Sequence, residues 1–265
     1  MAAKGFFTDT TVCIGCKACE VACKEWNQLP DDGLFFTGMS YDNTVDVGAS
    51  TWRHVSFIER PVALGGQETG LGDFSWLFMS DVCKHCRRAG CLEACPTGAI
   101  VRTEFDSVYV QPDVCNGCGY CITGCPFGVI DRRDDDGRAW KCTLCYDRLE
   151  EGMTPACAKA CPTESIIFGD LDELKTKARK RVEELHERGM EEAYLYGVDE
   201  INQPGTGGLN AFFLLTDEPE VYNLPPDPVV PTVLGLESWR SAALAAVGLA
   251  ASAAAAVLMT KGRSV

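Results

Sequence analysis

Sixteen cysteines determine which chemistry this chain of 265 residues could perform. They form four groups: Cys13, Cys16, Cys19 and Cys23; Cys83, Cys86, Cys91 and Cys95; Cys115, Cys118, Cys121 and Cys125; and Cys142, Cys145, Cys157 and Cys161. Groups one and three are spaced C-x2-C-x2-C-x3-C, group two opens to C-x2-C-x4-C-x3-C, and group four to C-x2-C-x11-C-x3-C. Such a row supplies three thiolates to one 4Fe-4S cluster from a tight loop, and its fourth thiolate to a neighbouring cluster. Four groups therefore predict four 4Fe-4S clusters.

Two other uses of cysteine fit this spacing less well. Structural zinc uses C-x2-C pairs separated by a longer spacer, and a third cysteine three residues later has no place around one tetrahedral ion. Disulfides require a geometry that rows spaced this tightly cannot all reach. Proline follows three of the four groups, as Pro96, Pro126 and Pro162, whereas Lys24 stands at that place in the first group. The repeat therefore favours iron-sulfur clusters, with a local departure at Lys24.

Charge and composition narrow the class of partner. The formal net charge of −14 argues against nucleic acid, which requires clustered Lys and Arg, so proteins are the expected partners. Only His54, His85 and His186 could supply imidazole, which leaves little for haem, copper or a histidine-based zinc enzyme. Basic residues beside the cysteines either raise cluster potentials or are solvated surface charges. They are Lys17, Lys24, Lys84, Arg87, Arg88, Lys141 and Lys159.

Two segments between cysteine groups carry further signals. Residues 24–82 form an insertion with aromatic clusters at Phe35-Phe36, Trp52, Phe57 and 74–78, expected to cover the clusters, to dock a subunit, or both. Residues 131–137 are acidic and predict a solvated turn between groups three and four.

The chain after residue 169 changes character. Apolar residues at helical spacing from Leu171 to Leu185 predict an amphipathic helix within 170–200, begun by a capping box of Asp170 and Glu173 and ended by Gly189. A short strand is expected over 211–216. The segment 201–237, acidic and proline-rich after residue 216, is expected to lie extended over another subunit, with a plain linker as the alternative.

The C-terminal segment predicts a single membrane-spanning helix at 238–260. Residues 241–259 carry no charge and are long enough to cross a hydrocarbon core, although their many alanines are only weakly apolar. Gly248 and Ser252 provide a small face for packing against partner helices. The basic tail 261–265 favours a cytoplasmic C-terminus and an extracytoplasmic cluster domain. The N-terminus shows no export signal. A soluble alanine-rich helix is the alternative.

Three segments carry a family resemblance. The sequences 13–23, 115–128 and 140–145 resemble the iron-sulfur beta subunits of molybdopterin oxidoreductases. Within that superfamily the chain is most similar to the beta subunit of membrane-bound respiratory formate dehydrogenase, a likeness that includes residues 41–43, 50–52 and 205–208.

The resemblance implies which cysteines share a cluster, whereas spacing alone also permits groups one with two and three with four. The resemblance pairs group one with group four and group two with group three. The implied ligand sets are Cys13, Cys16, Cys19 and Cys161; Cys142, Cys145, Cys157 and Cys23; Cys83, Cys86, Cys91 and Cys125; and Cys115, Cys118, Cys121 and Cys95.

The resemblance also implies a fold and a function. The expected fold is α+β, with two pseudo-twofold-related ferredoxin-like modules in residues 1–169, the covering insertion and the C-terminal helix. The expected function is electron transfer, without a catalytic site, from a molybdopterin (Mo or W) formate-oxidising subunit to a quinone-reactive membrane subunit carrying haem b or a similar group. The cluster-loaded protein would be exported bound to a partner with a twin-arginine signal. The alternatives are the same relay serving a sulfur-compound reductase, a sulfoxide reductase or a hydrogenase, and a non-redox scaffold.

Overall fold

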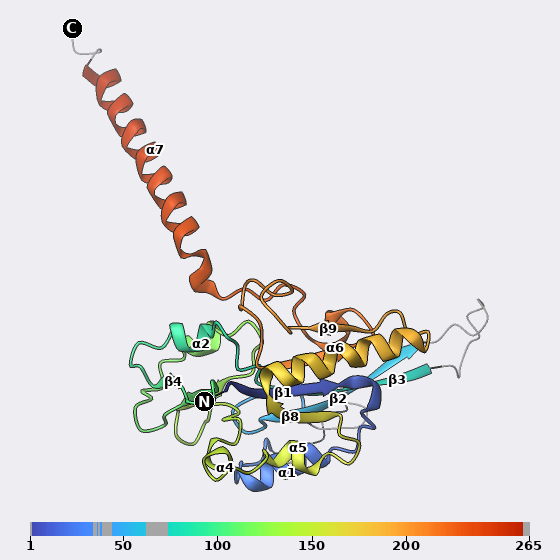
Figure 1. The fold of residues 1–265 in the computed structure, drawn as a ribbon. Coiled ribbons are helices and arrows are strands. Elements are labelled where there is room, and N and C mark those ends of the chain that lie inside the picture. The colour runs from blue at the N-terminus through green and yellow to red at the C-terminus, as the bar shows by residue number, and fades with distance from the viewer. Residues whose placement is uncertain (1, 34–35, 37, 39–43, 62–73, 262–265) are drawn as a thin grey trace.

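The computed structural model describes residues 2–33, 36, 38, 44–61 and 74–261, and Figure 1 shows their arrangement. They have the mixed α/β content that the sequence predicted, and a long C-terminal helix, α7 (Gly235–Lys261), projects from the body. Phe35, Tyr41–Asn43 and Arg263 lie outside the described residues.

A four-stranded sheet lies at the centre of the body, with the strand order β8-β1-β10-β9. Its strands are β1 (Lys4–Asp9), β8 (Ile166–Asp170), β9 (Tyr194–Tyr196) and β10 (Ala211–Leu215). β1 runs parallel to β10 and antiparallel to β8, so the start of the chain lies between two segments that are distant in sequence. Every residue of β10 is buried, which explains its unbroken apolar sequence and confirms the predicted strand.

The predicted amphipathic helix is α6 (Leu171–Glu187), which lies along the sheet in Figure 1. Its buried face is formed by Leu171, Leu174, Ala178 and Leu185, which pack with the apolar side chains of β1 and β10. The helix ends at Glu187, and Gly189 follows in the left-handed conformation with φ +87°, as expected of a residue that terminates a helix.

The predicted capping box at the start of α6 is wrong. Asp170 is the residue before the helix, but its side chain caps no backbone N–H there. Asp170 is also the last residue of β8 and is paired with Lys4 of β1, whose Nζ donates a hydrogen bond to its carboxylate at 2.7 Å. The Asp170 carboxylate therefore pairs with the Lys4 ammonium of the neighbouring strand instead of capping the N-terminus of α6.

The insertion contains a β-hairpin that the sequence analysis did not identify. Strands β2 (Arg53–Pro61) and β3 (Phe74–Val82) pair antiparallel, with Arg53 opposite Val82 and Pro61 opposite Phe74. The Phe57 and Phe78 rings meet edge-to-face with centroids 5.1 Å apart. The hairpin covers the first cysteine loop, because a Cβ placed on Gly15 would come within 2.7 Å of the Phe78 ring.

Short elements carry the cysteines. The helices are η1 (Thr10–Val12), α1 (Ala18–Trp26), α2 (Gly90–Glu93), α3 (Tyr120–Thr123), α4 (Tyr146–Glu150) and α5 (Ala156–Ala160). Two small hairpins accompany them: β4 (Ile100–Arg102) with β5 (Val108–Val110), and β6 (Asp131–Arg132) with β7 (Ala139–Trp140). The exposed turn between β6 and β7 confirms the predicted acidic turn.

Helix α1 packs beside α5, and α2 packs beside α3. A Cβ on Gly90 would lie 2.1 Å from the carbonyl oxygen of Gly124, so the backbones of α2 and α3 meet directly.

The segment that follows β10 packs on its own chain, which neither the expected contact with another subunit nor the alternative of a plain linker included. It contains η3 (Pro219–Tyr222) and η4 (Pro231–Leu234), and Tyr222, Leu224 and Val230 are buried. Its prolines alternate with apolar side chains that fit against the central core, although the segment has no strand of its own. The expected subunit contact stays a prediction.

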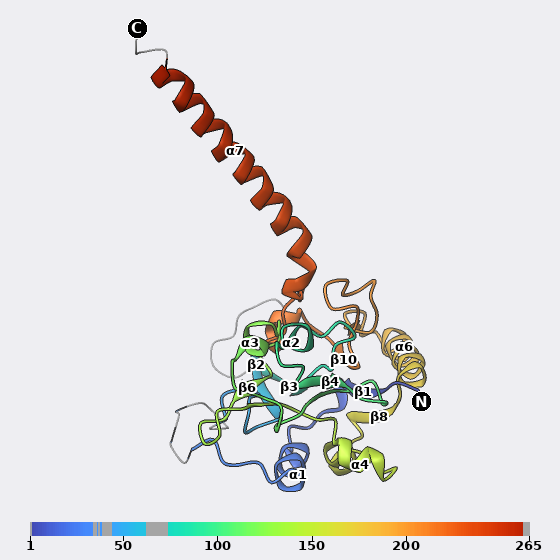
Figure 2. The ribbon, with the colours of Figure 1, turned by 90° about the vertical axis from the view of Figure 1, so that its left-hand side faces the viewer.

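Helix α7 leaves the body immediately after η4 (Figures 1 and 2). Its Trp239, Leu244, Val247 and Leu249 are all strongly exposed. Among the described residues, no helix combines the length and the hydropathy needed to cross a membrane. The span predicted at 238–260 therefore stays a prediction.

Candidate functional site

We call four sets of four cysteines sites 1 to 4. Two of the sets line one pocket each, and the members of the other two sets are electrostatic neighbours. Site 1 consists of Cys13, Cys16, Cys19 and Cys161, which line one pocket between the loop before α1, the end of α5 and the β2–β3 hairpin. The loop turns at Gly15 and Lys17, with φ values of +66° and +60°. Glycine is required at position 15 by its backbone angle and by the Phe78 ring beside it. This turn aims the first cysteine group at Cys161, which ends α5.

Site 2 consists of Cys142, Cys145, Cys157 and Cys23, all of which are buried. The packing of α1 beside α5 brings Cys23 to Cys157. The pKa of the Cys23 thiol is well above its ordinary value, first because burial disfavours a thiolate and then because Cys157, Cys142 and Cys145 would add negative charge beside it. The four thiols are therefore buried electrostatic neighbours.

Site 3 consists of Cys83, Cys86, Cys91 and Cys125, which line one pocket with Lys84, His85 and Lys141. Cys125 comes from the third cysteine group and reaches this pocket because α2 and α3 are in contact. Burial, together with nearby Cys83 and Cys125, raises the pKa of the Cys91 thiol to about 12.

Site 4 consists of Cys115, Cys118, Cys121 and Cys95. Burial raises the pKa of the Cys121 thiol to about 11, and the charges of the other three members add to this effect. The pKa of the Cys95 thiol is instead lowered, because its slight burial is outweighed by hydrogen bonds from the Thr97 side chain and nearby backbone N–H groups. Cys118 is exposed.

The four sites form a row. Each site approaches the next through one pair of cysteines that would act on each other electrostatically. The pairs are Cys19 with Cys157, Cys142 with Cys83, and Cys91 with Cys121. The order is therefore site 1, site 2, site 3, site 4. The exposed cysteines, Cys16 and Cys118, belong to the two ends of this row.

The basic residues predicted to lie near clusters separate by burial. Lys84 and Lys141 are buried, at 1% and 2% exposure. Arg87, Arg88 and Lys159 are exposed, whereas Lys17 and Lys24 are half-buried and form ion pairs with Glu20 and Asp32. Lys84 forms an ion pair with Asp81, which partly offsets its charge. Lys141 is therefore the member of this set that best fits the tuning interpretation, because it is buried and forms no ion pair with a carboxylate of the described residues.

Lys141 places a positive charge between sites 2 and 3. Its Nζ donates a hydrogen bond to the carbonyl oxygen of Cys142 at 2.9 Å and another to that of Val108. Burial would lower the pKa of this ammonium, but the negative charges of Cys83, Cys91 and Cys142 raise it. The group therefore stays charged beside both sites.

Two polar residues beside the sites were missed by sequence reasoning. Arg53, the first residue of β2, is 1% exposed and adjoins sites 1 and 2. His85 is equally buried, and its Nδ1 accepts a hydrogen bond from Val108 N at 3.0 Å, so the proton of the neutral ring is on Nε2, in the pocket of site 3. His85 lies inside a C-x2-C pair, which was an available signal. Arg53 lies in an insertion without cysteines and gave none.

The donor chemistry of the sites fits 4Fe-4S clusters. All sixteen cysteines are free of disulfide bonds, and thiolates are the ligands that such clusters use. Backbone N–H groups of Leu144 and Ala139 donate to the sulfurs of Cys142 and Cys115, each at 3.4 Å, a contact that tunes cluster potential. Within the part of the chain that the structure describes, no three His, Cys, Asp or Glu side chains converge to hold a single metal ion.

Comparisons with known proteins give the same cofactor class. The sequence pattern of a 4Fe-4S dicluster domain family matches residues 12–99, and a second pattern of that description matches residues 74–171. The chain is 42% identical over 250 residues to the nitrate-inducible formate dehydrogenase iron-sulfur subunit of Escherichia coli (strain K12), covering 92% of this chain and 80% of that protein. It is also 42% identical over 252 residues to the formate dehydrogenase iron-sulfur subunit of Haemophilus influenzae, covering 91% and 76%. The B subunit of the anaerobic dimethyl sulfoxide reductase of Escherichia coli (strain K12) is 33% identical over 173 residues, covering 65% and 76%.

Proposed function

Because this protein belongs to the family of formate dehydrogenase iron-sulfur subunits, we propose that it relays electrons from a formate-oxidising molybdopterin (Mo or W) subunit to a quinone-reducing membrane subunit. The observation that carries this proposal is the row of four cysteine sites with an exposed cysteine at each end. A bound 4Fe-4S cluster supplies a carrier of one electron at each site.

We propose four 4Fe-4S clusters, one at each site, with the site's four cysteines as ligands to iron. The assignment pairs the first cysteine group with the fourth and the second with the third. Its support is the shared pockets of sites 1 and 3 and the mutual electrostatic neighbours of sites 2 and 4. The packing of α1 beside α5 and of α2 beside α3 follows the same pairing.

The surrounding residues would exclude water and favour the reduced state. Sites 2 and 3 lie among buried side chains such as Leu144 and Val129, so charges there are weakly screened. Lys141 adds a positive charge between them, and the N–H of Leu144 donates to a ligand sulfur. Positive charge and hydrogen bonds to sulfur both raise a cluster's reduction potential.

Site 4 is proposed to face the membrane partner and site 1 the catalytic partner. Thr232 of η4, which directly precedes α7, contacts Glu93 of α2. Helix α2 contains Cys91 of site 3 and precedes Cys95 of site 4. A Cβ on Gly90 of α2 would lie 3.1 Å from the Val230 side chain, just before η4. Helix α1, beside site 1, lies on the side of the body away from α7 in both Figure 1 and Figure 2.

We further propose that α7 is a single membrane span, with a cytoplasmic C-terminus and the cluster domain outside. Residues 241–259 carry no charge, and the exposed apolar side chains of α7 are covered by no other described part of the chain. Apolar surface of this kind calls for lipid or partner helices. The basic residues Lys261 and Arg263 favour the cytoplasmic side.

One experiment tests the relay and its direction. The membrane complex is purified through a tag on this chain, and cluster reduction is followed by electron paramagnetic resonance after formate is added without mediators. Rapid reduction of several 4Fe-4S signals is the expected result. If formate reduces none while dithionite reduces them all, the formate assignment fails and the clusters remain.

A second candidate is the same relay in a sulfoxide reductase complex, which the similarity to the B subunit of dimethyl sulfoxide reductase favours. A membrane quinol would then reduce the clusters and the sulfoxide would reoxidise them.

A scaffold without redox function is tested by Cys118→Ser. If the complex assembles and electron transfer is unchanged despite an altered site 4, the relay is overturned.

A further inference from the structure

Arg53 is a buried cation with an incomplete set of hydrogen-bond partners. Its side chain is 1% exposed, and its guanidinium lies 4.9 Å from the centroid of the Phe6 ring. Nη1 donates to the carbonyl oxygen of Ser80 at 3.3 Å and to its hydroxyl at 3.0 Å. Nε and Nη2 are buried and have no partner among the described residues. A buried guanidinium normally has a hydrogen-bond acceptor for each of its N–H groups, because each buried N–H without an acceptor and each unpaired buried charge lowers stability.

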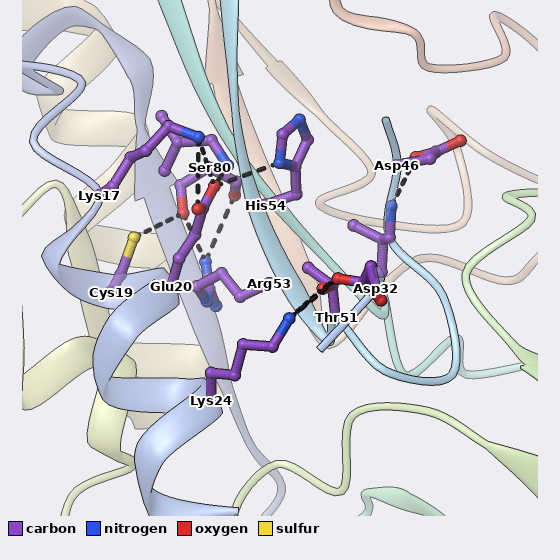
Figure 3. A network of polar contacts seen from close by, with 12 residues as sticks. Lys17, Cys19, Glu20, Lys24, Asp32, Asp46, Thr51, Arg53, His54 and Ser80 are labelled. Atoms are coloured by element: carbon purple, nitrogen blue, oxygen red, sulfur yellow. Dashed lines mark hydrogen bonds and ion pairs between the residues drawn. The ribbon is translucent and has the colours of Figure 1, made fainter. Parts of the chain in front are cut away.

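The charged neighbours of Arg53 are cysteines. The groups that act on it most strongly are Cys157, Cys19, Cys142 and Cys23, one from site 1 and three from site 2. No carboxylate of the described chain forms an ion pair with it. Glu20, close by in Figure 3, is instead engaged by Lys17, His54 and the backbone N–H of Val55.

Ser80 connects Arg53 to site 1. Its hydroxyl oxygen accepts from Nη1 of Arg53 and lies 3.3 Å from the sulfur of Cys19, as the dashed lines of Figure 3 show. Because the oxygen accepts from the guanidinium, the hydroxyl proton is available to point at the Cys19 sulfur. Arg53 therefore polarises a donor to a ligand of site 1, and it lines one cavity with Cys23 of site 2.

We propose that Arg53 is a cation shared by sites 1 and 2, which completes its hydrogen bonds on the clusters held there and raises the reduction potentials of both. Reduction adds one electron, and so one negative charge, to a site. A fixed positive charge in a weakly screened interior stabilises that added charge. Arg53 thus makes the first two steps of the row easier to reduce, as Lys141 does between sites 2 and 3.

This inference rests on the proposed four-cluster relay, and its test separates the two. The full chain is purified in its complex as wild type, Arg53→Met, Arg53→Lys and Arg133→Met, and iron content and midpoint potentials are measured by redox titration with paramagnetic resonance. Arg133→Met is the control, because it removes the same charge from a position over the Trp140 ring whose charged neighbours are Asp135 and Asp136 and include no cysteine. A wild type without clusters at sites 1 and 2 overturns the relay and with it the role of Arg53, whereas a fully loaded wild type lets the variants test Arg53 alone.

The expected result is that Arg53→Met lowers the midpoints of two clusters and leaves the other two at the values of the wild type and of Arg133→Met. The expected shift is at least tenfold in the equilibrium constant for reduction, which equals about 59 mV for a one-electron couple. Arg53→Lys, which keeps the charge but not the planar fork, should shift the same two midpoints less. Four unchanged midpoints in iron-loaded Arg53→Met, or equal shifts in all four, overturn the proposal. Should Arg53→Met lose iron, Arg53→Lys decides: a selective shift of two midpoints supports the proposal, and no shift overturns it.

Discussion

The two outer sites and the two inner sites each consist of four cysteines, but these lie in different surroundings. Sites 1 and 4 each include one exposed cysteine, whereas site 2 is buried throughout and site 3 shares its pocket with buried Lys84, His85 and Lys141. The basic residue next to the outer cysteine Cys16 is Lys17, which forms an ion pair with Glu20. The difference teaches that spacing specifies the type of cofactor, while burial and nearby charge specify its environment. An outer site suits exchange with a partner, and an inner site suits passage without water.

The largest difference is expected from removal of one ligand at each kind of site. Cys142→Ser, in the interior, should destabilise the loaded chain by about 4 kcal/mol or more, because a cluster is lost from a place where other buried groups depend on it. Cys118→Ser, at an exposed position, should alter site 4 alone. Iron content and the unfolding temperature, measured under anaerobic conditions, check both variants. Equal losses of iron and stability would remove the distinction between inner and outer sites.

Thiol reactivity sharpens the same comparison in the chain freed of clusters. Inner Cys91 has a pKa raised to about 12 by burial, whereas that of outer Cys95 is lowered. At pH 8 about 10⁻⁴ of Cys91 would be thiolate, so its alkylation should be about a thousandfold slower than that of Cys95. A raised pKa keeps the proton on sulfur, so the Cys91 rate should rise about tenfold per pH unit from 7 to 10, while the Cys95 rate levels off below pH 9.

Mass spectrometry after timed reaction with iodoacetamide gives both rates. The control is the chain in denaturant, in which the two cysteines should share one pH profile. Because cluster binding requires thiolates, the same pKa difference predicts that loading of the inner site gains more from rising pH. Equal profiles for Cys91 and Cys95 in the folded chain would contradict this.

Lys141 tests the role of charge between the inner sites. Lys141→Met removes the ammonium and leaves the carbonyl oxygens of Val108 and Cys142 without their donor, which should cost about 1–3 kcal/mol. It should also lower the midpoint potentials of two clusters, since the charge faces Cys83, Cys91 and Cys142. Thermal unfolding and redox titration of the loaded chain measure the two effects. If stability falls but the midpoint potentials stay unchanged, then Lys141 has a structural role only.

The sequence predicted the local features of these sites and missed those that depend on tertiary contacts. The cysteine spacings, the buried strand at Ala211 and the helix from Leu171 are local patterns, and the structure contains each of them. The β2–β3 hairpin was not identified because residues 62–73 separate its strands, whereas the strong hairpin signal is a two-residue turn. Lys4 displaced the capping role of Asp170 from far away in sequence.

Arg53 shows the same limit at the functional site. Its place beside sites 1 and 2 depends on the pairing of β2 with β3, which sets its guanidinium against Ser80. Among seven basic residues flagged beside the cysteines, sequence proximity alone did not separate buried Lys84 and Lys141 from exposed Arg87 or Lys159. Proximity in sequence to a ligand is therefore a weaker guide to tuning charge than burial is.

The smallest effect is expected from Lys17→Met, the outer counterpart of Lys141→Met. Lys17 follows Cys16 directly, yet its side chain is 23% exposed and its Nζ lies 3.3 Å from Glu20 Oε2, so its charge is partly offset and screened. Loss of a pair of this kind should change the free energy of unfolding by less than about 1 kcal/mol. The midpoint potential of one cluster should fall by less than in Lys141→Met. Parallel redox titrations of the two variants make the comparison, with Lys159→Met as a control for an exposed lysine near site 2. Lys17→Met could instead lower the midpoint potential of its cluster as much as Lys141→Met lowers those of two clusters. A position next to a ligand in sequence would then matter more than burial, and only solvent access would distinguish the outer from the inner sites.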